Sequence, residues 1–434
     1  MDENVQKSEN VFSNKNFRLV FLGALVSELG AILYSFAVSF YILEISNNNA
    51  FLQGLYLALC GVALLVLTPV GGVLGDRFNK AKIMFVCDYI KGGLIILATV
   101  LMMLLKDNSA QIVILFVIGI LGNAVSGVFT PASGAIFPEI VNEEKLQQAN
   151  AFFSIKSSLE GILGVILAGI LYAALPIYAL FFVVGACYIG SGISEMFIRY
   201  EYVPSEEHLT IRLAVHDMRD GLVYLKTKKP ILALLIAILF INFFFEPITG
   251  NFIPFFVKTD LASSPSYLLD GILTPELWSS VFSVCIGISS LVGAVILSSR
   301  PQKEKCGHAT AIKICIMAVI LAAITLSYWL LVERGASINA FLIAVCVVCL
   351  LLGFIIIYIN IPVSTTMMRI VDKDKLSKVN SIISIGSQGM IPIASVLAGA
   401  VLDSFGSTIL LFVCSIGFAI TAIVMFFNKH VKEI

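Results

Sequence analysis

The chain has 434 residues, of which 59% are hydrophobic and only 13% are charged. An average soluble chain carries about 25% charged residues, so about half of the usual solvating surface is missing, which excludes an ordinary soluble protein. We infer that lipid covers the remaining surface. The 28 basic and 28 acidic residues balance, and the net charge therefore gives no indication of nucleic acid binding. The nine cysteines show no zinc-site spacing and are interpreted as small core residues.

A polar tail of mixed charge, residues 1–17, precedes the apolar part of the chain. It lacks the basic-then-apolar order of a cleaved signal peptide, so we expect the first apolar segment to stay in the mature protein. Twelve segments then reach the ~20 apolar residues that a spanning helix needs. Residues 161–194 are uncharged but too long for one span, and Pro176 is expected to divide them. The predicted spans are centred near Leu29, Ala63, Leu97, Gly122, Leu163, Gly185, Phe243, Gly287, Ile320, Cys349, Met390 and Gly417.

Lysine and arginine are divided very unequally between the two sides of the predicted bundle. With the N-terminus placed inside, 25 of the 28 fall on the inner side, and only Lys106, Lys258 and Arg334 fall on the outer side. Positive charge is enriched in cytoplasmic loops. The sequence therefore predicts a multi-pass protein with both termini in the cytoplasm.

The longest inner connection lies halfway along the chain, between the sixth and seventh predicted spans. Leu213, Met218, Leu222 and Leu225 recur there at near-helical spacing, which predicts an amphipathic helix on the inner membrane surface. Six spans on either side of a connector are typical of transporters built from paired repeats, with the substrate site between the halves. We therefore predict a cytoplasmic N-terminal tail (residues 1–17), a six-helix N-terminal half (18–200) and a cytoplasmic connector (201–229). A six-helix C-terminal half (230–428) and a short C-terminal tail (429–434) follow.

The loop after the second predicted span carries the most specific motif. Glycines four residues apart, such as Gly71 and Gly75, allow two helices to approach closely, and Asp76 ends its helix where it can meet a cation or a helix N-terminus. Asn79 follows in the turn, and asparagine tolerates the left-handed backbone conformation better than most residues. The segment reads Gly72-Val-Leu-Gly75-Asp76-Arg77-Phe-Asn79-Lys80-Ala-Lys82.

This segment resembles the signature loop of the major facilitator superfamily, in which glycine occupies the position of Asn79. The resemblance implies an all-α membrane protein of twelve transmembrane helices with the major facilitator fold, built from two six-helix halves. It also implies an inner gate that closes against the start of the eleventh span, near residues 374–381. The gate residues implied by the motif are Gly72, Gly75, Asp76, Arg77, Lys80 and Lys82.

Four further segments, residues 129–141, 146–151, 219–225 and 242–254, together resemble the branch of bacterial macrolide-efflux proteins and the enterobactin exporter. That resemblance implies a drug:proton antiporter. Its cargo would be a lipophilic or amphipathic small molecule, such as a macrolide-type drug or a siderophore. The protein would lie in the inner membrane of a bacterium. Ile118 and Val165 replace an arginine and a proline of other antiporters, and these departures concern proton coupling rather than the fold.

Ionisable side chains within the predicted spans are candidates for function, because each costs at least ~2.5 kcal/mol at membrane depth. Glu28 in the first span is expected to bind the proton or a cationic substrate, and structural pairing is the alternative. Glu246 in the seventh span is a second candidate for proton or substrate binding, and a hydrogen-bonded group near the outer mouth is its alternative. Asp88 with Lys91, and Lys156 with Glu160, have the spacing of intrahelical ion pairs and are interpreted as structural.

We expect a central cavity between spans 1, 4, 7 and 10, with apolar walls from phenylalanines such as Phe36, Phe129 and Phe244. The chain has no zinc-protease helix, no nucleophile elbow and no phosphate-binding glycine loop. We therefore predict a monomer that is not an enzyme, with no cofactor or metal and no direct use of ATP. The predicted polar residues of the cavity are Glu28, Asn123, Asn242, Glu246 and Asn360.

Three alternatives stay open at this point. A carrier of the same fold with another cargo, such as a lysophospholipid flippase or a nutrient symporter, shares every feature above. A sensor that transports nothing is poorly supported, since the sequence contains no soluble domain to relay a signal. An intramembrane enzyme is disfavoured because the four histidines all fall in predicted cytoplasmic segments.

Overall fold

A computed structural model describes residues 11–141, 145–199, 219–220, 223–298, 307–371 and 376–428. These residues form helices joined by turns, and twelve of the helical stretches are long and apolar enough to cross a membrane. Each stretch contains the centre predicted for it from hydropathy. The prediction of a twelve-span, all-α protein is confirmed.

The first six spans are formed by the helices α1 to α8. The fifth span is continuous but contains a π-helical segment, η3, between α6 and α7. A short helix, α5, lies between the fourth and fifth spans. The bounds are α1 (Lys15–Ile45), α2 (Ala50–Arg77), α3 (Lys80–Leu104), α4 (Asn108–Ala135), α5 (Phe137–Ile140), α6 (Leu146–Leu159), η3 (Glu160–Gly164), α7 (Val165–Ala174) and α8 (Ile177–Met196).

The second six spans are formed by α10 to α16. The seventh span alternates between α-helix and π-helix, and the ninth span ends in a π-helical turn. The bounds are α10 (Lys229–Glu246), η4 (Pro247–Phe252), α11 (Ile253–Phe256), η5 (Val257–Leu261), α12 (Pro275–Ser298), α13 (Gly307–Tyr328), η6 (Trp329–Glu333), α14 (Ile338–Ile370), α15 (Leu376–Phe405) and α16 (Ser407–Phe427).

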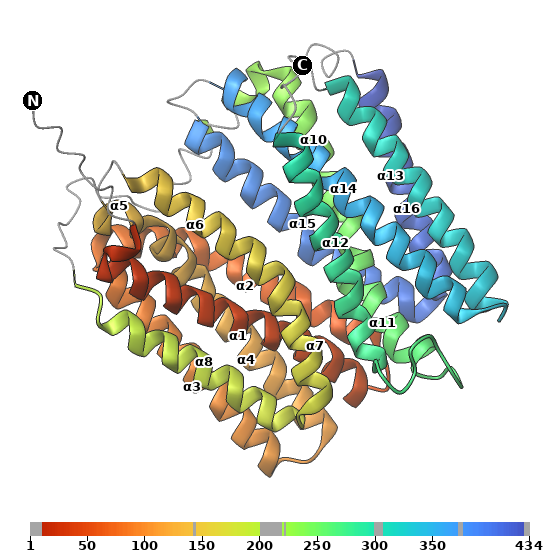
Figure 1. The fold of residues 1–434 in the computed structure, drawn as a ribbon, viewed down its shortest axis with the longest axis horizontal. Helices are drawn as coiled ribbons and strands as arrows, with labels where there is room; N and C mark the ends of the chain where they lie inside the picture. Colours follow the sequence, from red (N-terminus) through yellow and green to blue (C-terminus); the bar gives the residue numbers. More distant parts are fainter. Residues whose placement is uncertain are drawn as a thin grey trace, which may run out of the picture.

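The two sets of helices form two bundles that lie side by side (Figure 1). Two buried apolar clusters belong to the first bundle, and a third belongs mainly to the second. We call the end at which α1 begins the basic end, because the turn with Arg77, Lys80 and Lys82 lies there, and the end at which α1 meets α2 the far end. The predicted amphipathic helix falls largely on residues 200–218 and 221–222, outside the described part of the chain.

Two turns show how local sequence sets the helix boundaries. Pro176 begins α8 directly after the extended residue Leu175, so the predicted break in the long uncharged stretch is confirmed. At Asn79 the backbone is not left-handed, since its φ is −58°. Its side-chain oxygen instead accepts a hydrogen bond of 3.1 Å from the backbone N–H of Lys82. Asn79 is therefore the N-cap of α3, and the cap satisfies an N–H that has no partner within the helix.

Gly71 lies where α2 crosses α4 at short distance. A Cβ added to Gly71 would lie 2.5 Å from the carbonyl oxygen of Gly127 and 2.6 Å from the Cα of Val128. Both are backbone atoms of α4, so they cannot move aside as a side chain does. A Cβ on the adjacent Gly72 would meet nothing within 4 Å.

We predict that Gly71→Leu destabilises the first bundle, whereas Gly72→Leu does not. Forcing side-chain atoms into a packed contact typically costs ~1–3 kcal/mol, and here the two backbones must also separate. Thermal unfolding of the purified protein in detergent measures the effect. Equal melting temperatures for the two variants would show that the crossing of α2 and α4 tolerates a side chain.

Candidate functional site

The two bundles are in tight contact at the far end. A Cβ on Gly54 of α2 would lie 2.2 Å from the carbonyl oxygen of Ser395 on α15. Nearer the end, a Cβ on Gly399 would lie 2.4 Å from the carbonyl oxygen of Ala50. On the other side of the molecule Ser280 of α12 donates a hydrogen bond of 2.9 Å to the carbonyl of Val165. These contacts close the far end between the bundles.

Asp403, near the end of α15, reaches across this contact to the first turn of α2. Its two carboxylate oxygens accept hydrogen bonds of 2.8 Å each from the backbone N–H groups of Ala50 and Phe51. A carboxylate at a helix N-terminus satisfies free N–H groups and interacts favourably with the helix dipole. The second bundle thus caps a helix of the first.

Lys258 of η5 makes a second polar connection at the same end. Its ammonium lies 3.0 Å from a carboxylate oxygen of Glu44 on α1 and 3.0 Å from one of Glu276 on α12. We call Glu44, Lys258, Glu276 and Asp403 the far-end gate. No pattern in the sequence predicts this gate, because Asp403 and its partners are more than 350 residues apart.

Two cavities lie between the helices at membrane depth. The first, of about 320 Å³, is bordered by α1, α2, α3, α4, α8 and α15, and we call it the tyrosine cavity. The second, of about 290 Å³, is bordered by helices of both bundles, and we call it the glutamate cavity because Glu246 lines it. Ser35 and Leu57 line both. The polar side chains of the tyrosine cavity are Tyr34, Ser35, Tyr56, Cys60, Lys91, Asn123, Ser126, Tyr188 and Gln388.

Two of the predicted polar residues are brought to these cavities. Asn123 lines the tyrosine cavity, and its amide donates a hydrogen bond of 2.9 Å to the carbonyl of Gly119 on its own helix. Glu246 lines the glutamate cavity, where a Cβ on Gly250 would lie 2.6 Å from its carboxylate oxygen. The glycine therefore makes room for the carboxylate against its own helix.

The other three predicted residues do not line either cavity. Glu28 is exposed on α1, and its charge interacts with those of Asp88 and Lys91. Asn242 donates a hydrogen bond of 3.0 Å to Ile238 one turn earlier, and Asn360 is exposed on α14.

The three phenylalanines expected in the wall occupy different places. Phe36 lines the glutamate cavity. Phe129 is buried, with the ammonium of Lys91 4.8 Å from its ring centroid. Phe244 packs against Gly417 between α10 and α16 and lines neither cavity.

The predicted inner-gate loop lies at the basic end, where α2 turns into α3. Lys80 is buried and forms an ion pair with Glu139 of α5, which ties the loop to the end of the fourth span. Arg77 and Lys82 are exposed, and a Cβ on Gly75 would lie 3.8 Å from the nearest atom of α4. The side chain of Asp76 and most of the expected gate partner at residues 374–381 fall outside what the structure describes, so the gate contact stays a prediction.

Of the two predicted intrahelical ion pairs, the structure contains one and lacks the other. Lys156 and Glu160 are 2.8 Å apart, as predicted. Asp88 and Lys91 form no such pair, because the lysine extends between two aromatic rings, 4.8 Å from the centroid of Phe129 and 5.1 Å from that of Tyr188. Neither carboxylate oxygen of Asp88 has a hydrogen-bond partner. The prediction of a structural Asp88–Lys91 pair was therefore wrong.

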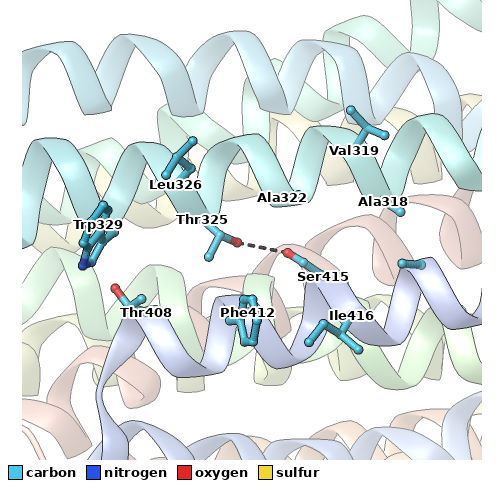
Figure 2. A pocket seen from close by; sticks show the side chains of 11 residues that line it. Ala318, Val319, Ala322, Thr325, Leu326, Trp329, Thr408, Phe412, Ser415 and Ile416 are labelled. Atoms are coloured by element: carbon cyan, nitrogen blue, oxygen red, sulfur yellow. Dashed lines mark hydrogen bonds between the residues drawn. The ribbon is translucent and has the colours of Figure 1, made fainter.

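A further depression of about 570 Å³ lies between α13 and α16 in the second bundle (Figure 2). Its wall is apolar except for Thr325, Ser415 and Thr408, and the first two hydroxyls are hydrogen-bonded to each other at 3.0 Å. Val319 and Phe412 in this wall are 69% and 54% exposed. Apolar side chains this exposed on two membrane-spanning helices belong to the lipid-facing surface, so this groove is not a substrate site between the bundles.

Known proteins resemble the chain in both sequence and fold. The curated transporter YkuC of Bacillus subtilis, described as an uncharacterized MFS-type transporter, is 24% identical over 78% of this chain and 76% of its own length. Macrolide efflux protein A of Streptococcus pyogenes is 24% identical over 54% of this chain and 57% of its own length. The enterobactin exporter EntS of Shigella boydii is 28% identical over 36% of this chain and 37% of its own length.

A solved structure shows the same fold in two states. The inward-facing structure of a bacterial homologue of the iron transporter ferroportin, 16% identical, covers 94% of this chain and 97% of its own with a TM-score of 0.71. Its outward-facing structure covers 94% of this chain and 98% of its own with a TM-score of 0.60. The sequence profile of the Major Facilitator Superfamily matches residues 20–395. The predicted resemblance is thus confirmed, and the chain belongs to the Major Facilitator Superfamily.

Proposed function

We propose that this transporter is a secondary efflux carrier that exports lipophilic or amphipathic small molecules in exchange for protons. The observation that carries the proposal is the tyrosine cavity, which combines three tyrosine rings and aliphatic side chains with a few polar groups. Pockets for small organic ligands have this composition, since apolar walls provide affinity and a few polar groups fix orientation.

The closed far end supports the proposal that cargo enters the carrier from the cytoplasm. The positive-inside rule places the basic end in the cytoplasm, so a carrier closed at the far end is inward-facing. The higher TM-score with the inward-facing ferroportin homologue, 0.71 against 0.60, agrees with this assignment. We propose that cargo enters from the cytoplasm and leaves when the halves rock and the far-end gate opens. The carrier acts as a monomer with both termini inside.

The names of the relatives support export and the broad chemical class of the cargo. A macrolide efflux protein and an enterobactin exporter are both similar to this chain, and each name describes a bulky organic molecule that leaves the cell. The sequence offers no nucleotide-binding loop, so the proton gradient is the proposed energy source. Glu246 in the glutamate cavity and Glu28 on α1 are the proposed proton or substrate carboxylates.

We predict that expression of the chain protects a pump-deficient bacterial host against at least one class in a panel of macrolides and lipophilic dyes. Glu28→Gln and Glu246→Gln are expected to abolish most of this protection, because an amide can neither release nor bind a proton at neutral pH. The measurement is the minimal inhibitory concentration at matched expression. Asp107→Asn is the control, since Asp107 only caps α4 within the first bundle. Protection against nothing in the panel would contradict multidrug export.

Everted membrane vesicles test the coupling separately. Uptake of a protective compound into such vesicles corresponds to export from the cell, and it should rise with an imposed pH gradient that is acidic inside. Transport that ignores the gradient would leave the cargo assignment intact and overturn proton antiport.

A further inference from the structure

Two carboxylates are buried in the first bundle, and no described residue donates a hydrogen bond of good geometry to them. Asp88 of α3, which lies beside the hydroxyl of Ser191, and Glu195 of α8 are both 0% exposed. Glu195 packs against α1, where a Cβ on Gly23 would lie 3.1 Å from its Cγ and 3.3 Å from its Oε1. A glycine on α1 thus makes space for an acidic side chain that nothing neutralises by hydrogen bonding.

One cation accompanies these two acids. Lys91 is 7% exposed, and its charge interacts with those of Asp88 and Glu195 although it forms no direct ion pair with them. Two ionised carboxylates and one ammonium would leave a net charge of −1 inside the bundle. An uncompensated charge at membrane depth costs at least ~2.5 kcal/mol, and removing the excess with one bound proton avoids that cost.

We propose that Asp88, Lys91 and Glu195 form a proton-binding site in which the two carboxyl groups share one proton, and we call these three residues the buried charge cluster. A metal ion fits poorly here, because the described surroundings offer aromatic rings and the hydroxyl of Ser191, which already donates a hydrogen bond of 2.8 Å to the carbonyl of Gly23. Hard cations require several oxygen ligands.

Other titratable groups face the cluster from its own two helices, α3 and α8, and from α1, which packs against them. Glu28 belongs to α1, Cys87 to α3 and Tyr188 to α8, and the charges of the cluster interact with each of them. Glu28 is the exposed member of this set. It is therefore the member of this set that the bundle does not enclose, and the group through which a proton can leave the cluster.

Lys91 links the cluster to the tyrosine cavity, because it lines that cavity together with Tyr188, and its ammonium lies 5.1 Å from the centroid of the Tyr188 ring. A cargo that stacks on this ring displaces the ammonium from it towards the carboxyl groups. An ammonium closer to the carboxyl groups favours their ionised form, so the shared O–H bond breaks and the proton passes to the Glu28 carboxylate. Cargo binding and proton release are thereby coupled. The release of the proton on cargo binding rests on the proposed antiport. The presence of a bound proton in the cargo-free protein does not depend on that proposal.

Infrared spectroscopy of the purified full-length protein in detergent tests the site without any cargo, because the C=O stretch of a protonated carboxyl group differs from the bands of a carboxylate. At neutral pH, Glu195→Gln and Asp88→Asn are each expected to remove the same single-carboxyl band, since the remaining acid pairs with Lys91. Lys91→Met is expected to increase the band about twofold, since both acids then need a proton. Glu160→Gln is the matched control and leaves the band unchanged, because Glu160 pairs with Lys156 at 2.8 Å.

The carboxyl band is expected to disappear in two variants and to grow in the third, so the test stays decisive even if one variant folds poorly. A band that survives Glu195→Gln or Asp88→Asn, or that fails to grow in Lys91→Met, would overturn the shared proton. If the band behaves as expected but the wild-type chain exports nothing in the vesicle assay, the proton site stands and the proposed function fails.

Discussion

A disulfide bond between cysteines introduced by Gly169→Cys and Ser280→Cys is expected to form in high yield and to stop transport until it is reduced. The two positions lie on α7 and α12, in different bundles. A Cβ on Gly169 would lie 3.1 Å from the Cβ of Ser280, and disulfides prefer a separation of ~3.5–4.5 Å. A backbone shift of a few tenths of an ångström is enough to form the bond.

The disulfide blocks transport because alternating access requires these two helices to separate at the far end. The pair is introduced into a chain whose nine native cysteines are replaced, and cross-linking is measured together with uptake into everted vesicles. Gly161→Cys combined with Ser280→Cys is the matched control, since a Cβ on Gly161 meets nothing within 4 Å. Full transport by the cross-linked chain would show that the far-end contact does not open during the cycle.

The fold could be predicted from the sequence because its main determinants are local. Runs of apolar residues set the spans, and single residues such as Pro176 set their boundaries. Asn79 replaces the glycine of the signature loop without loss of the turn, because it acts through its side chain as a helix cap.

The candidate site could be predicted only in part. Glu246 and Asn123 could be picked out because they interrupt apolar spans, a signal visible within a single helix. They line two separate cavities, however, and not the one cavity that we expected between spans 1, 4, 7 and 10. Glu195 was not predicted, because it directly follows the uncharged stretch and only the packing of α8 against α1 buries it completely. The orientation of Lys91 depends on rings from α4 and α8 and has no signal within α3.

The far-end gate shows most clearly what a single sequence leaves undetermined. Asp403 precedes the last span, in a segment that reads as an ordinary helix end, and its partners are backbone N–H groups that carry no side-chain signature. Only the docking of α15 on α2 gives it a role. A carboxylate that caps a helix of the opposite bundle contributes to one state of the carrier and not to the other, so its removal changes a population rather than the fold.

Asp403→Ala is accordingly expected to shift the carrier away from the state closed at the far end. Hydrogen bonds to charged groups contribute ~1.5–3 kcal/mol each, but Asp403 is exposed, so we expect a net loss of about 1 kcal/mol and a change of about fivefold in the ratio of the two states. The readout is the initial rate of cross-linking of the cysteine pair at positions 169 and 280, which falls as the closed state is depopulated.

Asp107→Ala provides the matched control for this experiment. Asp107 also caps a helix at the far end, accepting a hydrogen bond of 2.9 Å from the backbone N–H of Ala110, but cap and helix belong to the same bundle. Its loss destabilises α4 without favouring either state, so the cross-linking rate should stay at the wild-type value. A slower rate in Asp403→Ala alone assigns the effect to the contact between bundles. Equal slowing in both variants would mean that any lost helix cap loosens the far end and that Asp403 has no particular role in the gate.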